Sequence, residues 1–212
     1  MHRELPHFDK KYLIQSVTTR LYDSIPKLKI IYLQERLKPL NQNERKIELA
    51  RQLEAFLDKG EGQQFMMNHD VAKIVEDQLL EIFISDGLIA WVIMPNHVHF
   101  ITARRLSTSL KELIKRWKGI SAYKCNILLK RHGYFWAKNY FDRFIRDEEH
   151  LNRCVQYINY NPVKAGLVRN PSEYPFCSAA RRDFNPFKIH LLTFAFIVKQ
   201  SLTFLLFEVL YM

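Results

Sequence analysis

Two histidines separated by one residue, His97 and His99, are the first side chains whose type and spacing suggest chemistry. They follow a continuous apolar run at residues 88–94, and they open a segment, residues 97–102, with the composition of a strand. Alternate residues of a strand point to one face of its sheet, so both imidazoles are able to bind one cation. Ordinary strand histidines have the same spacing, so this pair alone does not establish a metal site.

Tyr157 and Asn161 form a second pair, four residues apart in a segment with helical spacing of its apolar residues. That spacing places the phenol and the amide on one face of a helix. An amide oxygen is a hard ligand that suits Mg²⁺ or Mn²⁺ better than zinc. A tyrosine beside such a cation is able to attack a phosphodiester. Most of the ten tyrosines should be packing residues, and Tyr160 lies on the same predicted helix.

Other chemistries have little support in the sequence. There is no G-x-S-x-G motif, no Cys-x-x-Cys pair and no glycine-rich phosphate loop. A zinc site that combined the two histidines with cysteines is conceivable, but the three cysteines lack ligand spacing. Their odd number argues against a disulfide framework and for a reducing compartment. The N-terminus lacks the apolar region of a signal peptide, so we expect a cytoplasmic protein.

Positive charge is concentrated in one part of the chain, whose formal net charge is +10. Residues 101–146 alone hold twelve basic and two acidic side chains, with eight aromatic residues interleaved among them. Basic groups neutralise phosphates and aromatic faces stack on bases, so this mixture suits a nucleic-acid channel, although a solvated helix face over core aromatics has the same composition. We expect Trp117 to be packed inward beside a groove that leads to the histidines. The expected DNA contacts are Lys111, Lys115, Lys118, Arg143 and Arg146.

The remaining pattern mixes helices with short strands. Without regular βαβ alternation, this mixture favours an α+β fold with an antiparallel sheet. The predicted elements are a strand at residues 11–19, a helix at 43–59 ended by Gly60, a helix from Asp70 ended by Gly87, a helix begun by the capping box at Ser109, a short strand pair or loop at 134–145, and a helix that Asp147 caps and Pro162 stops at or just before Asn161.

The C-terminal segment, residues 189–212, is strongly apolar but carries Lys199 near its middle. In a membrane helix that lysine would cost about 2.5–3.5 kcal/mol. We therefore expect a core or interface element, or a segment acquired by a change of reading frame, and no membrane partner.

Several motifs occur in order along the chain: LPHFD at residues 5–9, AWVIMPNHVH at 90–99, YFDRFIRD at 140–147, YINYNPVKAGLV at 157–168 and the Ser178-Ala179 pair. Together they resemble the HUH single-tyrosine transposases (His, bulky hydrophobic, His), and within that family the REP-associated tyrosine transposases. The resemblance extends over about residues 4–182 and fades after Arg182.

The resemblance implies a ferredoxin-like or RRM-like antiparallel sheet packed by helices. It implies a transposase domain at residues 1–182 with a helical insertion at 27–59, followed by the apolar tail 183–212. His97 and His99 match the metal-binding histidines, Asn161 matches the third ligand position, and Tyr157, five residues before Pro162, matches the nucleophile. Related transposases are dimers, so a homodimer is a further expectation.

These observations predict a transposase or nickase that requires Mg²⁺ or Mn²⁺. It would cleave and rejoin single-stranded DNA at hairpin-forming palindromic repeats through a 5′-phosphotyrosine intermediate. The alternatives are an RRM-like nucleic-acid-binding protein without catalysis, an inactive or decayed transposase copy, and a structural metal protein, which would need a fourth tight ligand. The geometry around His97 and His99 distinguishes these possibilities.

Overall fold

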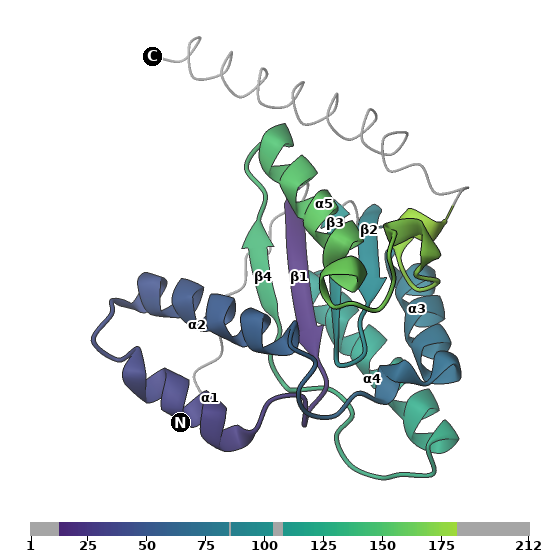
Figure 1. Ribbon diagram of the computed structural model, residues 1–212, viewed down its shortest axis with the longest axis horizontal. Coiled ribbons are helices and arrows are strands. Elements are labelled where there is room, and N and C mark those ends of the chain that lie inside the picture. Colours follow the sequence, from purple (N-terminus) through teal and green to yellow (C-terminus); the bar gives the residue numbers. More distant parts are fainter. Residues whose placement is uncertain (1–12, 85, 104–107, 182–212) are drawn as a thin grey trace.

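The computed structural model describes residues 13–84, 86–103 and 108–181 (Figure 1). In this part of the chain, four strands form one antiparallel sheet in the order β2-β3-β1-β4, accompanied by five α-helices. The α+β fold predicted from the sequence is confirmed. The elements are β1 Ile14–Arg20, α1 Lys27–Arg36, α2 Gln42–Leu57, α3 His69–Phe83, β2 Leu88–Ile93, β3 His97–Ala103, α4 Leu110–Leu128, β4 Phe141–Phe144 and α5 Glu148–Lys164.

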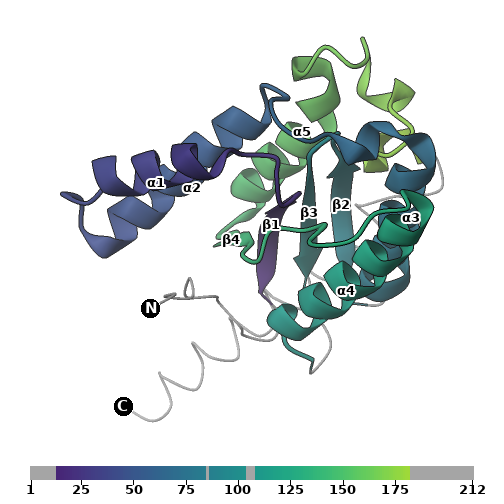
Figure 2. The ribbon, with the colours of Figure 1, turned by 90° about the horizontal axis from the view of Figure 1, so that it is seen from below.

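The sheet has different layers on its two faces (Figure 2). Helices α3 and α4 cover one face, where Val98 and Phe100 of β3 join their apolar side chains. Helix α5 covers the other face, where Ile101 of β3 packs. Because successive strand residues point to opposite faces, His97 and His99 lie on the same face as α5.

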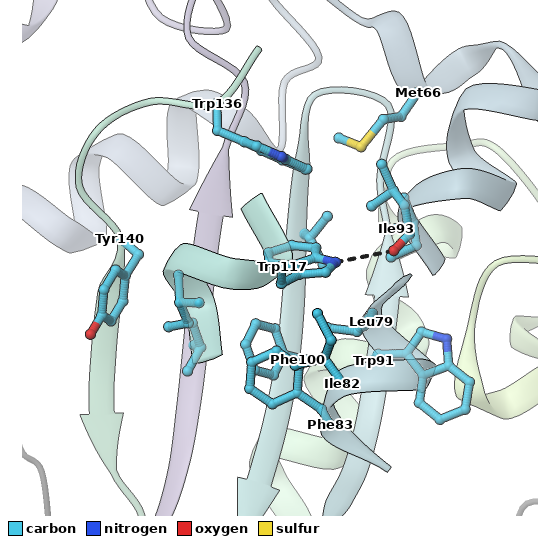
Figure 3. Close-up of a cluster of buried hydrophobic side chains, with 14 of the residues drawn as sticks. Met66, Leu79, Ile82, Phe83, Trp91, Ile93, Phe100, Trp117, Trp136 and Tyr140 are labelled. Carbon is cyan, nitrogen blue, oxygen red and sulfur yellow. Dashed lines mark hydrogen bonds between the residues drawn. The ribbon is translucent and has the colours of Figure 1, made fainter. Parts of the chain in front are cut away.

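Trp117 lies at the centre of the core between the sheet and helices α3 and α4 (Figure 3). Its side chain is 0% exposed, and its indole N–H donates to the carbonyl oxygen of Val75 at 3.2 Å. The inward packing predicted from helical spacing is therefore confirmed. Burying the indole without an acceptor for its N–H would cost about 1–3 kcal/mol, and this bond removes that cost.

Local signals set the N-termini of α4 and α5 as predicted. Ser109 accepts from the backbone N–H of Glu112, and the Glu112 carboxylate accepts from the backbone N–H of Ser109, which completes a capping box. Asp147 accepts from the backbone N–H of His150 at 2.7 Å. Each cap satisfies amide groups that the first turn of a helix leaves without partners.

The predicted end of α5 is wrong. The helix does not stop at Asn161 but continues through Pro162 to Lys164. Proline removes one backbone donor, but the next turn still forms, because the N–H of Ala165 donates to the carbonyl oxygen of Asn161 at 3.0 Å. Tyr157, Asn161 and Lys164 therefore project from one continuous helix.

The expected insertion at residues 27–59 consists of two helices, α1 and α2, which extend from one side of the sheet (Figure 1). They have a small core of their own, formed by Ile25, Leu33, Leu53 and Leu57. The C-terminal end of α2 returns to the sheet on the side of α5 (Figure 2).

Two expectations concern regions beyond these elements. Within residues 134–145, where the sequence predicted a short strand pair or a loop, Phe141–Phe144 form one strand, β4, which pairs with β1. The tail at 183–212 lies outside the described residues, so its role and the domain division at residue 182 stay predictions. Among the described residues, the helices are all too short or too polar to cross a membrane.

Candidate active site

His97 and His99 lie side by side on β3, with ring centroids 4.6 Å apart, as the alternation of the strand predicts. The two side chains are almost completely buried, and both Nε2 atoms are without a hydrogen-bond partner. Burial lowers the pKa of His97 to about 3 and that of His99 well below its usual value. Both imidazoles are therefore neutral at pH 7, which is the form that binds metal ions.

Two carboxylates from the end of α2 approach the histidines, and the sequence analysis did not identify either of them. Asp58 Oδ1 is 3.9 Å from His97 Nε2, and Glu54 Oε1 is 3.7 Å from His99 Nδ1. Burial raises the pKa of both carboxyl groups. Their only signal in the sequence is their spacing of four residues on one predicted helix, which does not show where that helix packs.

Tyr157 projects from α5 onto the same cluster. Its ring centroid is 5.4 Å from that of His99, and its hydroxyl group donates to Asp58 Oδ2 at 3.4 Å. Burial, and then the charges of Glu54 and Asp58, raise the pKa of Tyr157 above its usual value, so the phenol is protonated. By contrast, 55% of Tyr160 is exposed.

The buried atoms without partners converge in a way that fits a divalent cation. The donor atoms of Asp58, His97 and His99 all lie within 4.8 Å of one another. Asp58 Oδ1 and both Nε2 atoms are buried without hydrogen-bond partners. Buried polar atoms normally have partners, so three such atoms around one point indicate a ligand site. Two imidazoles and a carboxylate are nitrogen and oxygen donors that bind divalent metal ions.

Asn161 lies one helical turn from Tyr157 and is 1% exposed. Its Nδ2 atom is also buried without a partner. A rotation of the amide by 180° would present the acceptor Oδ1 at the same place. Its place as a third or fourth ligand stays a proposal.

Two basic side chains border this cluster. Lys164 Nζ is 3.9 Å from Asp58 Oδ2 and 5.1 Å from the centroid of the Tyr157 ring. Arg143 of β4 pairs with Ser16 of β1, two residues from Thr18, so it lies on the histidine face. Its positive charge contributes to the lowered pKa of His99 after burial. An anionic substrate beside Tyr157 would therefore meet positive charge.

The structure does not place the α4 lysines beside the histidines. Lys111, Lys115 and Lys118 belong to α4, which covers the opposite face of the sheet. The expected groove that joins them to the histidines is absent from the described residues, because the strand residues that meet α4 are those that alternate with the histidines. Arg146 precedes α5, where its backbone N–H contacts His150 Nδ1 at 3.4 Å.

Lys118 differs from the other two lysines because it is largely buried. Its ammonium group donates to the carbonyl oxygens of Ala137 at 3.0 Å and Asn139 at 3.3 Å. Burial lowers its pKa to about 7. The side chain thus ties α4 to the loop before β4.

The structure thus combines an α+β fold with a buried cluster of two histidines, a carboxylate and a tyrosine that could hold a metal ion. Residues 64–161 match the family model described as "Transposase IS200 like". This chain is similar to that family over this segment, which contains both histidines, Tyr157 and Asn161 but not Asp58.

Two curated proteins are similar to this chain. The REP-associated tyrosine transposase of Escherichia coli strain K12 is 31% identical over 121 residues, which are 56% of this chain and 65% of that protein. A Haemophilus influenzae protein assigned to the same group is 26% identical over 103 residues, 44% of this chain and 58% of that protein. The match therefore spans less than two thirds of either relative.

One solved structure has the same fold. It is that of a REP-associated tyrosine transposase bound to a REP hairpin, with a TM-score of 0.57 and 17% sequence identity. The similarity covers 87% of this chain and 89% of that one, so it extends beyond the segment that the family model matches.

Proposed function

We propose that this protein is a metal-dependent transposase or nickase that cleaves and rejoins single-stranded DNA through a 5′-phosphotyrosine intermediate. The observation that carries the proposal is one cluster drawn from distant parts of the chain. It combines the neutral imidazoles of His97 and His99, the unpartnered oxygen of Asp58 and the hydroxyl group of Tyr157. Binding of nucleic acid alone requires neither a metal site nor a buried phenol.

In this proposal His97, His99 and Asp58 hold the cation, with Asn161 as a further ligand. We assign Mg²⁺ or Mn²⁺, because phosphoryl chemistry and the oxygen ligands suit these ions. When bound, such an ion offsets negative charge on the non-bridging oxygens of the scissile phosphate.

Tyr157 is the nucleophile. Its Oη forms a bond to phosphorus while the bond from phosphorus to the 3′ oxygen breaks. This leaves a 5′-phosphotyrosine and a 3′ oxygen, which takes a proton from water to become a free 3′-OH. The phenolic proton has an acceptor in place, because the hydroxyl group already donates to Asp58 Oδ2. Attack by the 3′-OH of a second strand reverses the step, so rejoining needs no ATP.

We further propose that the substrate is a DNA hairpin formed by a palindromic repeat. Support comes from the related structure bound to a REP hairpin and from the basic residues around the site. Arg143, Arg146 and Lys164 would contact the strand that enters beside Tyr157. A homodimer stays a prediction from the resemblance. A cytoplasmic location, at the nucleoid through bound DNA, stays a prediction from the cysteines and the N-terminal sequence.

Lys111 and Lys115 would still contact DNA, as the sequence predicts, if a second DNA-binding surface lies on the α4 face. This surface has a shallow groove of about 500 Å³, and exposed Tyr123 offers a stacking face. The groove is lined by Glu112, Lys115, Arg116, Gly119, Ile120 and Tyr123. Lys118 would support this surface from within, through its bonds to the loop before β4.

The proposal is tested by formation of a covalent adduct. The full chain is incubated with a single-stranded hairpin oligonucleotide and Mn²⁺, and adducts are separated on a denaturing gel. We expect an adduct that Tyr157→Phe and excess chelator each abolish, with binding retained. Tyr160→Phe is the matched control, because Tyr160 is exposed on the same helix. An adduct that only Tyr160→Phe removes would contradict the assignment, and binding without any adduct would favour a nucleic-acid-binding protein.

A further inference from the structure

Asn96 occupies the turn between β2 and β3, immediately before His97, and its side chain is 1% exposed. The amide bridges two parts of the molecule. On one side, Nδ2 donates to the carbonyl oxygens of Leu57 at 3.2 Å and Glu61 at 3.3 Å, at the C-terminal end of α2. On the other side, Oδ1 is 2.6 Å from His97 Nδ1.

The partners of this amide determine its orientation. Backbone carbonyl oxygens only accept hydrogen bonds, so the atom that faces Leu57 and Glu61 must be the nitrogen. The atom that faces His97 is then the amide oxygen, which also only accepts. His97 Nδ1 must therefore carry the proton, and the lone pair of its Nε2 points to the cluster with Asp58 and His99.

Nothing equivalent fixes the second histidine. His99 Nδ1 is 2.8 Å from Thr18 Oγ1, and a hydroxyl group is able either to donate or to accept. The threonine therefore permits either tautomer of His99, whereas Asn96 permits only one tautomer of His97. This asymmetry makes Asn96 the residue that defines the direction of a ligand lone pair.

The end of α2 that holds Asn96 is itself firmly placed. Leu57 and Asp58 are adjacent, so one short segment both orients the His97 imidazole and supplies the carboxylate. Beyond Glu61, Gly62 has φ +80°, and a Cβ there would clash with the Ser24 carbonyl oxygen. The backbone N–H of Gln63 donates to the Asp23 carbonyl oxygen at 3.1 Å, which holds the loop against the chain that follows β1.

We propose that Asn96 is a positioning residue of the metal site, which links the end of α2 to His97 and fixes the Nδ1–H tautomer of that histidine. The insertion of α1 and α2 is thereby part of the metal site and not an appendage. The part of this inference that concerns a cation rests on the proposed function, whereas the tautomer does not. Outer partners of metal-binding histidines typically affect metal affinity by about 10–100-fold.

The first test is direct and needs neither metal nor DNA. A long-range ¹H–¹⁵N correlation spectrum of the full chain, labelled on histidine and kept in chelator near pH 7.5, reports which ring nitrogen carries the proton. His97→Gln assigns its signals. We expect Nδ1 protonated and Nε2 unprotonated, and a His97 protonated on Nε2 would overturn the proposal even if DNA cleavage were demonstrated.

Variants separate the two contacts of the amide. Asn96→Ala removes the acceptor, so we expect mixed tautomers of His97 and Mn²⁺ affinity lowered about 10–100-fold in an EPR titration. Asn96→Asp keeps an acceptor for His97 but cannot donate to α2 when ionised, so the Nδ1–H tautomer should persist. Asn126→Ala is the control, because that amide makes the same kind of bond, to the Gly133 carbonyl oxygen at 3.0 Å, at the end of α4.

The outcomes are decisive in each arm. An Asn96→Ala protein with an unchanged tautomer and unchanged Mn²⁺ affinity contradicts the proposal, as does loss of the Nδ1–H tautomer in Asn96→Asp. If Asn96→Ala does not fold, the spectrum of the unmodified chain and the aspartate variant still decide the matter. Normal tautomer and metal binding without any DNA cleavage would contradict the proposed function but leave the role of Asn96 intact.

Discussion

Mild acid should destabilise the cation-free protein, because His97 and His99 are buried in their neutral forms. Burial lowers the pKa of His97 from 6.5 to about 3 and lowers that of His99 as well. The unfolded chain binds protons at both positions once the pH falls below about 6.5, whereas the folded chain does not. The stability that these groups contribute is therefore fully present above pH 6.5 and is lost as the pH falls toward about 3.

The magnitude follows from proton linkage. Between pH 7.5 and pH 5.5, one histidine with an unfolded pKa of 6.5 that stays neutral when folded loses about 1.4 kcal/mol of stability. Two such histidines give a loss of about 3 kcal/mol. Glu54 and Asp58 act in the opposite sense, because their raised pKa values let the folded state take up protons first. They reduce the loss toward the acid end of the range.

The assay is urea unfolding in chelator at both pH values, with the free energy of unfolding extrapolated to water. We expect His97→Gln to remove about half of the pH-dependent loss. His132→Gln, at an exposed position, is the control and should leave that loss unchanged. Equal stability at the two pH values, or an undiminished loss in His97→Gln, would refute the reasoning from burial.

Three further changes probe other parts of the structure. Asp58→Asn should weaken Mn²⁺ binding by about 100-fold or more in an EPR titration, because loss of an outer partner alone costs about 10–100-fold. The control Glu48→Gln, on the same helix, should leave Mn²⁺ binding unchanged. Lys118→Met should lower the free energy of unfolding by about 1–3 kcal/mol, because two loop carbonyl groups lose their donor. Alanine at both Lys111 and Lys115 should flatten the salt dependence of single-stranded DNA binding by about 1.4 in the log–log slope, and an unchanged slope would show a merely solvated face.

Much of the fold was predictable because its signals are local. The two strands around the turn at Asn96 follow from an apolar run and a proline. The helix caps at Ser109 and Asp147 follow from side chains that accept bonds from the first turn. The shared face of His97 and His99 follows from strand alternation alone.

The parts that the sequence did not predict depend on how elements pack against one another. Helical spacing shows that Trp117 is buried, but it does not show which face of the sheet α4 covers. Because α4 covers the face opposite the histidines, Lys115 lies far from them. In the same way, the spacing of Glu54 and Asp58 predicts that they share one face of a helix, but it does not predict that this face packs against the histidines. The end of α5 was wrong because one missing donor at Pro162 did not outweigh the bonds of the next turn.

The most direct test of the central claim is anomalous diffraction from crystals of this protein grown or soaked with Mn²⁺. The account predicts one Mn²⁺ peak bound by His97 Nε2, His99 Nε2 and an oxygen of Asp58, with the Tyr157 hydroxyl group beside it. A manganese ion bound elsewhere, or a crystal saturated with Mn²⁺ in which the histidine cluster shows no anomalous peak, would contradict it.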